Sequence, residues 1–353
     1  MGSTLLEQWK YTDLAKLWRD RVFIEAAEKR RSLITLPDSA QGITVRRSRL
    51  AKPQWQNHPL LAPHTAQMTQ AMVIDVPDNV VVDQPIRISY PASGLSENTL
   101  LNYRHIIRVG KDSQVTVIEE MAGGSEHFIV LNTVLQVVLA PNATVDHYSI
   151  QTPSNIAHVS YVHAQQSQHS QFRSFVAGLG GKFGRYDIQA DLLEPHASCV
   201  FNGFYLLNQQ QHFDVHTLAN HAASDTKSDE LFKGIIGGTA RGVFNGKVLV
   251  PKGVSNIDAN QINRNLLVSM GAEIDTKPEL QIDSDAVKCS HGATIGQLDQ
   301  QALFYLQSRG IAEMRAKQML TEGFMVECLE QVLQLELKQY LTQAVSARLQ
   351  EGL

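Results

Sequence analysis

The sequence predicts a mainly β protein with a helical region at each end. Short apolar runs rich in β-branched residues follow one another between residues 67 and 297, and apolar residues recur at helical spacing only outside this span. The chain of 353 residues is therefore expected to comprise an N-terminal helical and irregular region (1–66), a β body (67–297) and a C-terminal helical domain (298–353).

The N-terminal region begins with a helical pattern. Apolar residues recur at helical spacing from Leu5 to about Ala27, and basic residues at 29–31 would lie near the C-terminal end of a helix, where the helix dipole favours them. Residues 32–66, with prolines at 37, 53, 59 and 63, are expected to be irregular.

The β body contains many short strand patterns joined by a recurring turn. "VTVI", "TVLQVVL", "VSYVHA" and "KVLV" are strand-like, and junctions such as "VGKDSQVTV" (109–117) and "LAPNATVDH" (139–147) place a tight turn between two strands. No helix-length amphipathic segment separates the strands, which argues against Rossmann-type and TIM-type folds. The turns follow no single fixed period, so a sandwich, a barrel and a β-helix all remain possible.

The C-terminal domain returns to helical spacing after Asp299. "DQQALFYLQSRG" places Gly310 where a helix would end, a second helical stretch follows, and a last helix is expected from Leu335 to Leu349. The second stretch carries more apolar positions than one short helix needs, so we expect it to bind a partner. The expected partner-binding residues are Ile311, Met314, Met319, Leu320, Phe324 and Leu329.

The amino-acid composition argues against several classes of function. A net charge of -4 and 19% charged residues give no general attraction to phosphate or to anionic lipid, which disfavours nucleic-acid and membrane partners. The longest apolar stretch (128–140) is interrupted by polar residues, and no secretory signal is evident, so we expect a soluble cytoplasmic protein. Three scattered cysteines predict reduced thiols rather than a disulfide framework.

Two further motifs carry weak functional signals. The glycine-rich "GLGGKFG" (178–184) lacks the first glycine and the hydroxyl residue of a phosphate loop, so its glycines are expected to serve turns or close packing of coils. In "HFDVHTLANH", an extended strand would place His212, Asp214 and His216 on one face, but its outer members would lie about 13 Å apart. A solvated polar ladder is therefore favoured there over a metal site.

Cys289 and His291, in "DAVKCSHGATIG" (285–296), form the strongest candidate site. They would share one face of a strand, and thiolate and imidazole both bind iron and zinc. A Cys-His nucleophile pair is a second possibility, although no oxyanion loop or orienting residue can be placed. Two well-packed side chains are a third, and two ligands alone would leave a four-coordinate site half empty, so a partner would have to supply the others.

Three stretches resemble the SufB/SufD family of iron-sulfur cluster assembly proteins. They are "EQWKYTDLAKL" (7–17), "FKGIIGGTARGVFNGKVLV" (232–250) and "QINRNLLVSMGAEIDTKPELQIDSDAVKCSHGATIGQLDQQALFYLQSRGI" (261–311). The resemblance runs from about residue 7 to about residue 330. It is stronger to SufD than to SufB, because of the "WKYTDL" head and because a cysteine-rich N-terminal segment is missing. Only six residues precede Glu7, where many SufD proteins carry a longer helical region.

This resemblance implies a right-handed parallel β-helix core flanked by helical regions, in a complex with SufB and the ATPase SufC. SufC binds the C-terminal helical parts of the family, and Cys289 and His291 match positions at the SufB-SufD interface, where the histidine is implicated in binding iron or a nascent cluster. We therefore expect a scaffold subunit that is not itself an enzyme and that forms a homodimer when isolated. An iron-sulfur cluster or iron would be shared transiently with SufB, with none expected in the isolated chain.

Two other functions remain as alternatives. A stand-alone SufB-like scaffold would need about four cluster ligands within one chain, which three scattered cysteines do not readily provide. A β-helix carbohydrate-active enzyme would need a secretion signal and clustered catalytic side chains, and neither is evident.

Overall fold

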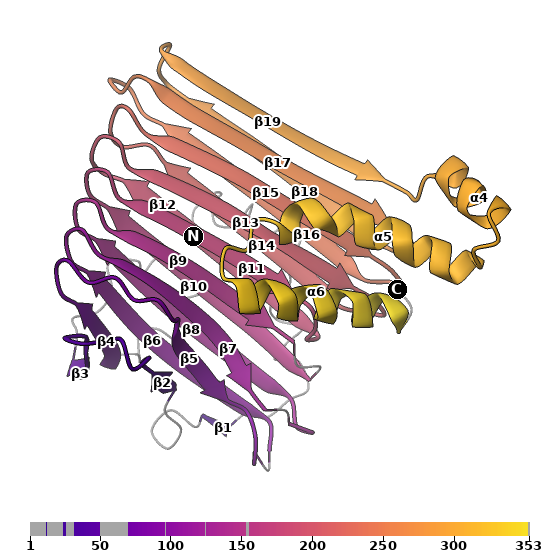
Figure 1. Ribbon diagram of the computed structural model, residues 1–353, viewed down its shortest axis with the longest axis horizontal. Helices are drawn as coiled ribbons and strands as arrows, with labels where there is room; N and C mark the ends of the chain where they lie inside the picture. The colour runs from indigo at the N-terminus through magenta and orange to yellow at the C-terminus, as the bar shows by residue number, and fades with distance from the viewer. Residues whose placement is uncertain are drawn as a thin grey trace.

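The core of the molecule is a parallel β-helix (Figure 1). The computed structural model describes residues 12, 24–25, 32–49 and 70–351, apart from 96, 124, 153 and 154. Strands with even and odd numbers mostly fall into two different sheets, so the chain crosses from one sheet to the other and back as it winds. Of the three architectures that strand patterns left open, the β-helix is confirmed.

The first sheet, called sheet A, contains ten strands, and all neighbours pair in parallel except β3 with β4. In order along the sheet they are β3 (Thr44–Arg49), β4 (Gln70–Val76), β6 (Thr99–Val109), β8 (Ile129–Leu139), β10 (Ile156–Gln166), β12 (Phe183–Leu192), β14 (His212–Asn220), β16 (Arg241–Val250) and β18 (Glu273–Ile282), with β1 (Ile24–Glu25) beside β6.

The second sheet, called sheet B, contains nine strands, and only β2 pairs antiparallel with its neighbour. In order they are β2 (Leu33–Thr35), β5 (Ile86–Pro91), β7 (Gln114–Ala122), β9 (Thr144–Gln151), β11 (Gln171–Gly178), β13 (Ser198–Leu207), β15 (Lys227–Ile236), β17 (Ile257–Leu267) and β19 (Val287–Gly296).

The recurring turn predicted from the sequence has a backbone cause. One residue in each such turn adopts a left-handed conformation, as Asp112 (φ 55°), Asn142 (φ 62°) and His169 (φ 58°) do. Asn, Asp and His tolerate this conformation better than most residues. The backbone N–H of Asp112 donates to the Pro141 carbonyl at 3.1 Å, and that of Asn142 to the Gln168 carbonyl at 2.9 Å, so successive turns stack on one another.

Apolar side chains fill the space between the two sheets. Large aromatic residues lie there almost without solvent contact, among them Phe172, Phe201, Tyr205, Phe232 and Phe244. The glycine-rich stretch predicted to serve close packing does so, because a Cβ added at Gly178 or Gly184 would lie within 2.7 Å of the Phe213 ring.

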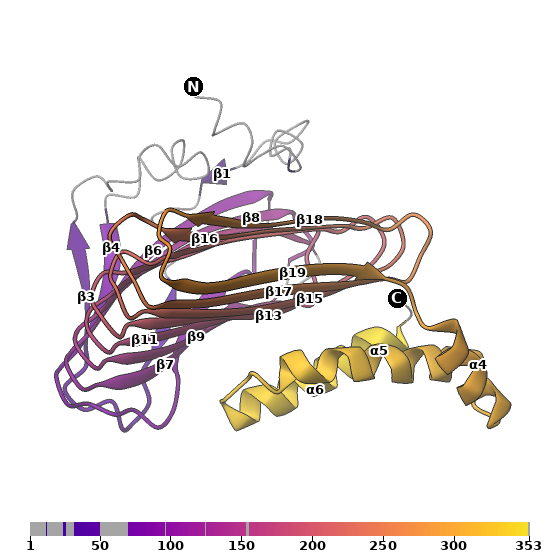
Figure 2. The same ribbon diagram turned by 90° about the horizontal axis from the view of Figure 1, so that it is seen from above.

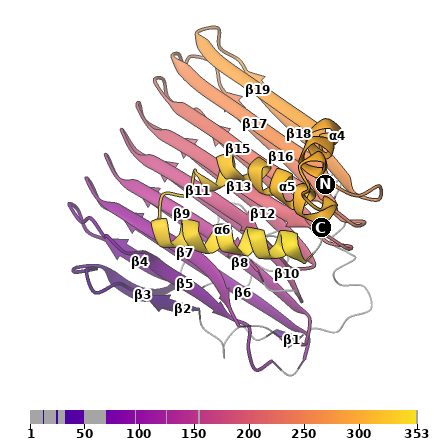
Figure 3. The ribbon, with the colours of Figure 1, turned by 45° about the vertical axis from the view of Figure 1, so that its right-hand side comes forward.

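The helical tail lies along the outer face of sheet B, as Figures 2 and 3 show. It consists of α4 (Gln300–Ser308), α5 (Glu313–Leu329) and α6 (Leu335–Gln350), and Gly310 (φ 85°) follows α4 where the sequence predicts a helix end. Apolar residues of α5 and α6, such as Met325 and Leu341, pack with Phe175 and Phe204 of sheet B. Glu327 of α5 also pairs with Lys233 of β15 at 2.6 Å.

The two ends of the β-helix differ. At the first end, β2 and β3 pair antiparallel with the coils, although residues 32–66 are expected from the sequence to be irregular. Most of the helix expected over residues 5–27 lies outside the described residues, but Ile24–Glu25 form a strand rather than a helix. At the last end, β18 and β19 each pair on one side only within the described part of the chain, so the final coil presents two strand edges there.

No helix of the described residues is both long enough and apolar enough to span a bilayer.

Candidate functional site

Cys289 and His291 lie in β19, the edge strand of sheet B at the last coil. In the parallel pairing with β17, Cys289 stands opposite Ala259 and His291 opposite Gln261. Cys289 packs against the apolar cluster that ends the core, whereas the Ser290 hydroxyl donates to the Asn260 side chain on the other face at 2.9 Å. Strand alternation therefore places Cys289 and His291 together on the inner face, as the sequence predicts.

The two side chains differ in their surroundings. His291 is exposed, and among the described residues it has no hydrogen-bond partner. Cys289 is half-buried, and burial raises the pKa of its thiol, helped by the nearby Asp258 carboxylate. A thiol in this state keeps its proton near neutral pH, so it becomes a ligand only when a bound metal or a positive group lowers its pKa.

Two polar side chains lie behind His291 on the inner face of sheet B. Gln261 of β17 and Glu230 of β15 occupy the same register column as His291, and both are buried. The Gln261 Nε2 donates to the Glu230 Oε2 at 2.6 Å. Burial raises the pKa of Glu230 to about 7. The column is spaced by 31 and then 30 residues along the chain, and because the turns follow no fixed period the sequence alone contains no signal for it.

Within the described ranges, no group of three or more histidine, cysteine, aspartate or glutamate side chains is arranged to hold a metal ion. His291 and Cys289 can therefore supply two ligands at an open strand edge, and a bound metal would need others from outside this part of the chain.

The other histidine cluster forms an ion network on the outer face of sheet A. His212, Asp214 and His216 do share one side of β14, but Asp214 accepts a hydrogen bond from the fully buried Arg185 at 2.5 Å and interacts with His216 at 3.1 Å. Burial opposes ionisation of Asp214, yet the Arg185 guanidinium holds the pKa of this carboxyl well below its usual range. A carboxylate already neutralised in this way is a poor metal ligand.

Thr12 explains why this network is buried. Its side chain, itself buried, contacts the Asp214 carboxylate and lies 3.0 Å from the His212 Nε2. The solvated ladder favoured from the sequence is therefore wrong for Asp214, which is only 1% exposed, because a residue far away in the chain covers it.

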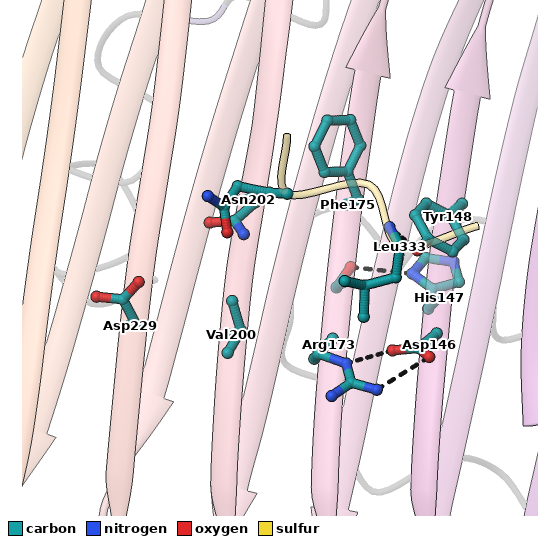
Figure 4. A pocket seen from close by; sticks show the side chains of 11 residues that line it. Asp146, His147, Tyr148, Arg173, Phe175, Val200, Asn202, Asp229 and Leu333 are labelled. Carbon is teal, nitrogen blue, oxygen red and sulfur yellow. Dashed lines mark hydrogen bonds and ion pairs between the residues drawn. The ribbon is translucent and has the colours of Figure 1, made fainter. Parts of the chain in front are cut away.

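A cavity of about 220 Å³ lies between sheet B and the connection from α5 to α6 (Figure 4). Two pairs of its polar groups contact each other. Arg173 forms a two-pronged ion pair with Asp146, and the backbone N–H of Leu333 donates to the Tyr148 hydroxyl at 3.1 Å. The Leu333–Tyr148 contact joins the helical tail to the sheet, whereas the Arg173–Asp146 pair links two neighbouring strands of sheet B.

The six apolar residues expected to bind a partner fall on different sides of the tail. Met314 is 75% exposed and Met319 is exposed as well, whereas Ile311 and Leu320 are half-buried. Leu329 is buried against sheet B. The Phe324 ring lies 4.7 Å from the Lys233 Nζ, so it faces the β-helix too.

Two exposed aromatic residues were missed from the sequence. Phe304 and Tyr305 of α4 are 71% and 56% exposed, and α4 contacts α5, the helix that carries the exposed Met314. Their position in "ALFYLQ" was the available signal, since two adjacent aromatics cannot both face one side of a helix.

Comparison with known proteins places these features in a family. A family model described as "SUF system FeS cluster assembly, SufBD core domain" matches residues 92–324, which include Cys289 and His291. An iron-sulfur cluster assembly SufBD family protein of Synechocystis is 35% identical over 296 residues, covering 81% of this chain and 65% of that protein.

Two further relatives support the same assignment. The chloroplastic protein ABCI7 of Arabidopsis thaliana is 32% identical over 269 residues, 73% of this chain and 56% of that protein. The iron-sulfur cluster assembly protein SufD of Escherichia coli is 30% identical over 276 residues, 76% of this chain and 63% of that protein. The chain thus spans 56 to 65% of the length of these three relatives.

Proposed function

We propose that this chain, which belongs to the SufB/SufD family of iron-sulfur cluster assembly proteins, acts as the SufD-like, non-catalytic subunit of a scaffold complex with SufB and SufC. In this complex it pairs with SufB through the last coil of its β-helix and binds the SufC ATPase through its helical tail. The iron or nascent cluster is the cargo of the complex rather than a resident cofactor of this chain.

The observation that carries the proposal is the position of His291. It lies on the inner face of an edge strand whose other edge has no partner among the described residues, beside a second potential ligand, Cys289. A metal held there by two side chains needs further ligands, and a chain that docks on the same strand edge is placed to supply them.

His291 is proposed as the principal ligand and Cys289 as a secondary one. A neutral imidazole binds iron without losing a proton, whereas the Cys289 thiol must first ionise against the raised pKa that burial gives it. Cys289 therefore contributes less to iron binding until the metal is already in place.

The remaining cysteines support a shared site over a self-sufficient one. Cys199 and Cys328 are buried, and burial raises the pKa of both thiols, that of Cys328 to about 12. Cys328 donates to the Gly203 carbonyl at 3.1 Å under the helical tail, far along the chain from β19. Neither thiol is available as a cluster ligand in this fold, so a stand-alone SufB-like scaffold is the weaker function.

The open strand edge also leads us to expect a particular oligomeric state for the isolated chain. Unpaired backbone groups on β18 and β19 can be satisfied by a second copy of the same coil, related by twofold symmetry. We expect a homodimer when SufB is absent, which light scattering at tens of micromolar protein would measure. A strictly monomeric protein at that concentration would contradict this use of the edge.

Co-expression with SufB and SufC tests the proposed function. We expect a stable three-component complex in size-exclusion chromatography, and ultraviolet-visible and Mössbauer spectra of an iron-sulfur cluster after anaerobic purification. A chain that neither enters the complex nor changes its cluster content would contradict the proposal.

A further inference from the structure

The last coils contain two parallel columns of polar side chains, one on each face of sheet B. Residues 229, 260 and 290 form the outer column, and residues 230, 261 and 291 form the inner one, because each column follows the strand register of β15, β17 and β19. The two columns are neighbours in sequence and differ only in the face of the sheet to which they belong.

The outer column is a complete hydrogen-bonded ladder. The Asn260 Nδ2 donates to the Asp229 Oδ1 at 2.9 Å, and the Ser290 hydroxyl donates to the Asn260 Oδ1 at 2.9 Å. The Asn260 amide thus donates a hydrogen bond to the Asp229 carboxylate and accepts one from the Ser290 hydroxyl on the edge strand. Both of its functional groups are used.

The inner column repeats this ladder except for its last bond. The Gln261 Nε2 donates to the Glu230 Oε2 at 2.6 Å, which fixes the orientation of the amide because a carboxylate accepts from the nitrogen side. The Gln261 Oε1 is buried and, among the described residues, has no hydrogen-bond partner, although Gln261 itself is 0% exposed. A buried oxygen left in this state destabilises the fold unless a donor reaches it.

The opposite sheet holds the Gln261 amide in place. Gly246 of β16 faces it so closely that a Cβ added there would lie 2.0 Å from the Nε2. The space that this glycine leaves open is therefore filled by the amide, which has little freedom to turn.

Unlike the exposed His291, the buried histidines of the described residues have both ring nitrogens in contact with polar partners. His147 contacts Glu119 and Ser174 at 2.8 and 2.9 Å, and His158 contacts Tyr186 and Thr133 at 2.8 and 2.9 Å. His291 stands next to the unsatisfied Gln261 amide oxygen in the register and itself has no hydrogen-bond partner among the described residues, so its imidazole N–H is the nearest candidate donor for the inner column.

We propose that Gln261 is a positioning residue for His291, its Oε1 accepting the N–H of the imidazole so that the other ring nitrogen is left free for iron. The hydrogen bond selects one neutral tautomer and fixes the plane of the ring, as partners behind metal-binding histidines commonly do. Glu230 strengthens the acceptor by accepting the Gln261 N–H from behind. The iron-binding part of this proposal rests on the proposed function, but the hydrogen bond itself does not.

The hydrogen bond can be tested in the full-length chain without iron. The chain is labelled with ¹⁵N-histidine, the His291 signals are assigned by their loss in His291→Gln, and the tautomer is read from ¹⁵N shifts at a pH where the imidazole is neutral. We expect one dominant tautomer in the wild type and a mixture in Gln261→Met, which keeps the volume but removes the acceptor. Gly246→Ala should have the same effect, because the added methyl group would push the Gln261 amide out of its position although residue 261 is unchanged.

Asn260→Ala is the matched control, because it removes an amide from the adjacent position on the outer face. It should leave the His291 tautomer unchanged. A wild-type His291 that populates both neutral tautomers, or a tautomer unaffected by both Gln261→Met and Gly246→Ala, would overturn the proposal.

The functional consequence is measured in the complex with SufB and SufC. Gln261→Met is expected to weaken iron retention by about 10- to 100-fold, the usual effect of removing a partner behind a ligand, without changing complex assembly. If His291→Ala retains full cluster content while the His291 tautomer still responds to Gln261, the ligand role fails and the hydrogen bond stands. If His291→Ala loses the cluster and Gln261→Met does not, the positioning role in cluster binding is wrong.

Discussion

Replacing Glu230 by Gln should change how the stability of the fold depends on pH. Glu230 is buried between the sheets, and its burial raises its pKa from 4.5 to about 7. Below pH 4.5 the carboxyl is protonated in both the folded and the unfolded chain, so its titration then contributes nothing to the pH dependence. Between pH 4.5 and about 7 the unfolded chain has lost this proton while the folded chain still holds it, so stability falls across this range and the loss is complete above about pH 7.

The magnitude follows from the size of the shift. A difference of about 2.5 pKa units corresponds to about 3 kcal/mol of lost unfolding free energy above pH 7, at roughly 1.4 kcal/mol per unit. Glutamine has nearly the shape of the protonated carboxyl and cannot ionise. The Glu230→Gln chain should therefore be close to the wild type at pH 5 and more stable by about 3 kcal/mol at pH 8.

Urea unfolding followed by circular dichroism at fixed protein concentration measures this difference across the pH range. Asp229→Asn is the control, because it removes the same charge from the next residue, which faces outward and is exposed. The Asp229 charge makes only the smallest contribution to the raised pKa of Glu230, so the difference between Asp229→Asn and the wild type should change far less between pH 5 and pH 8 than that of Glu230→Gln. A Glu230→Gln difference that stays constant over this range, or one that shrinks as the pH rises, would refute the reasoning.

Two further predictions concern the helical tail. Leu341→Ala should lower the unfolding free energy by about 2–5 kcal/mol, because the side chain is fully buried between the tail and sheet B. Met314→Ala, at an exposed position, is the control and should change the unfolding free energy little in the same urea titration. The double variant Phe304→Asp, Met314→Asp changes two exposed positions and should weaken co-purification with SufC by about tenfold or more. Its circular dichroism spectrum should stay unchanged. If the double variant still binds SufC, the SufC contact lies elsewhere.

The turns and helix ends could be predicted because each depends on the backbone preferences of a few neighbouring residues. Turn residues that tolerate a left-handed backbone, such as Asn142 and His169, mark the corners of the coils, and Gly310 marks the end of α4. The helix expected from Leu335 to Leu349 runs from Leu335 to Gln350. These features depend on a few neighbouring residues, so they can be recognised without knowing what packs against them.

Contacts between distant residues could not be predicted in the same way. The apolar spacing of α5 does not distinguish Leu329, which packs on sheet B, from Met314, which is exposed, because both belong to a helix with apolar residues on more than one side. The partnership of Gln261 with Glu230 depends on coils of 31 and 30 residues, and the turns show no constant period from which to count. Asp214 likewise gives no local sign that Thr12 covers it.

The iron and acid-labile sulfide content of the intact complex shows whether His291 binds the iron or the nascent cluster. Wild-type, His291→Ala and Cys289→Ala chains are each co-expressed with SufB and SufC and purified anaerobically as assembled complexes. We predict that His291→Ala assembles normally but loses most of its iron and sulfide, and that Cys289→Ala loses less. Full iron and sulfide content in the His291→Ala complex would contradict the ligand role, and failure of that variant to assemble would show that His291 serves the interface instead.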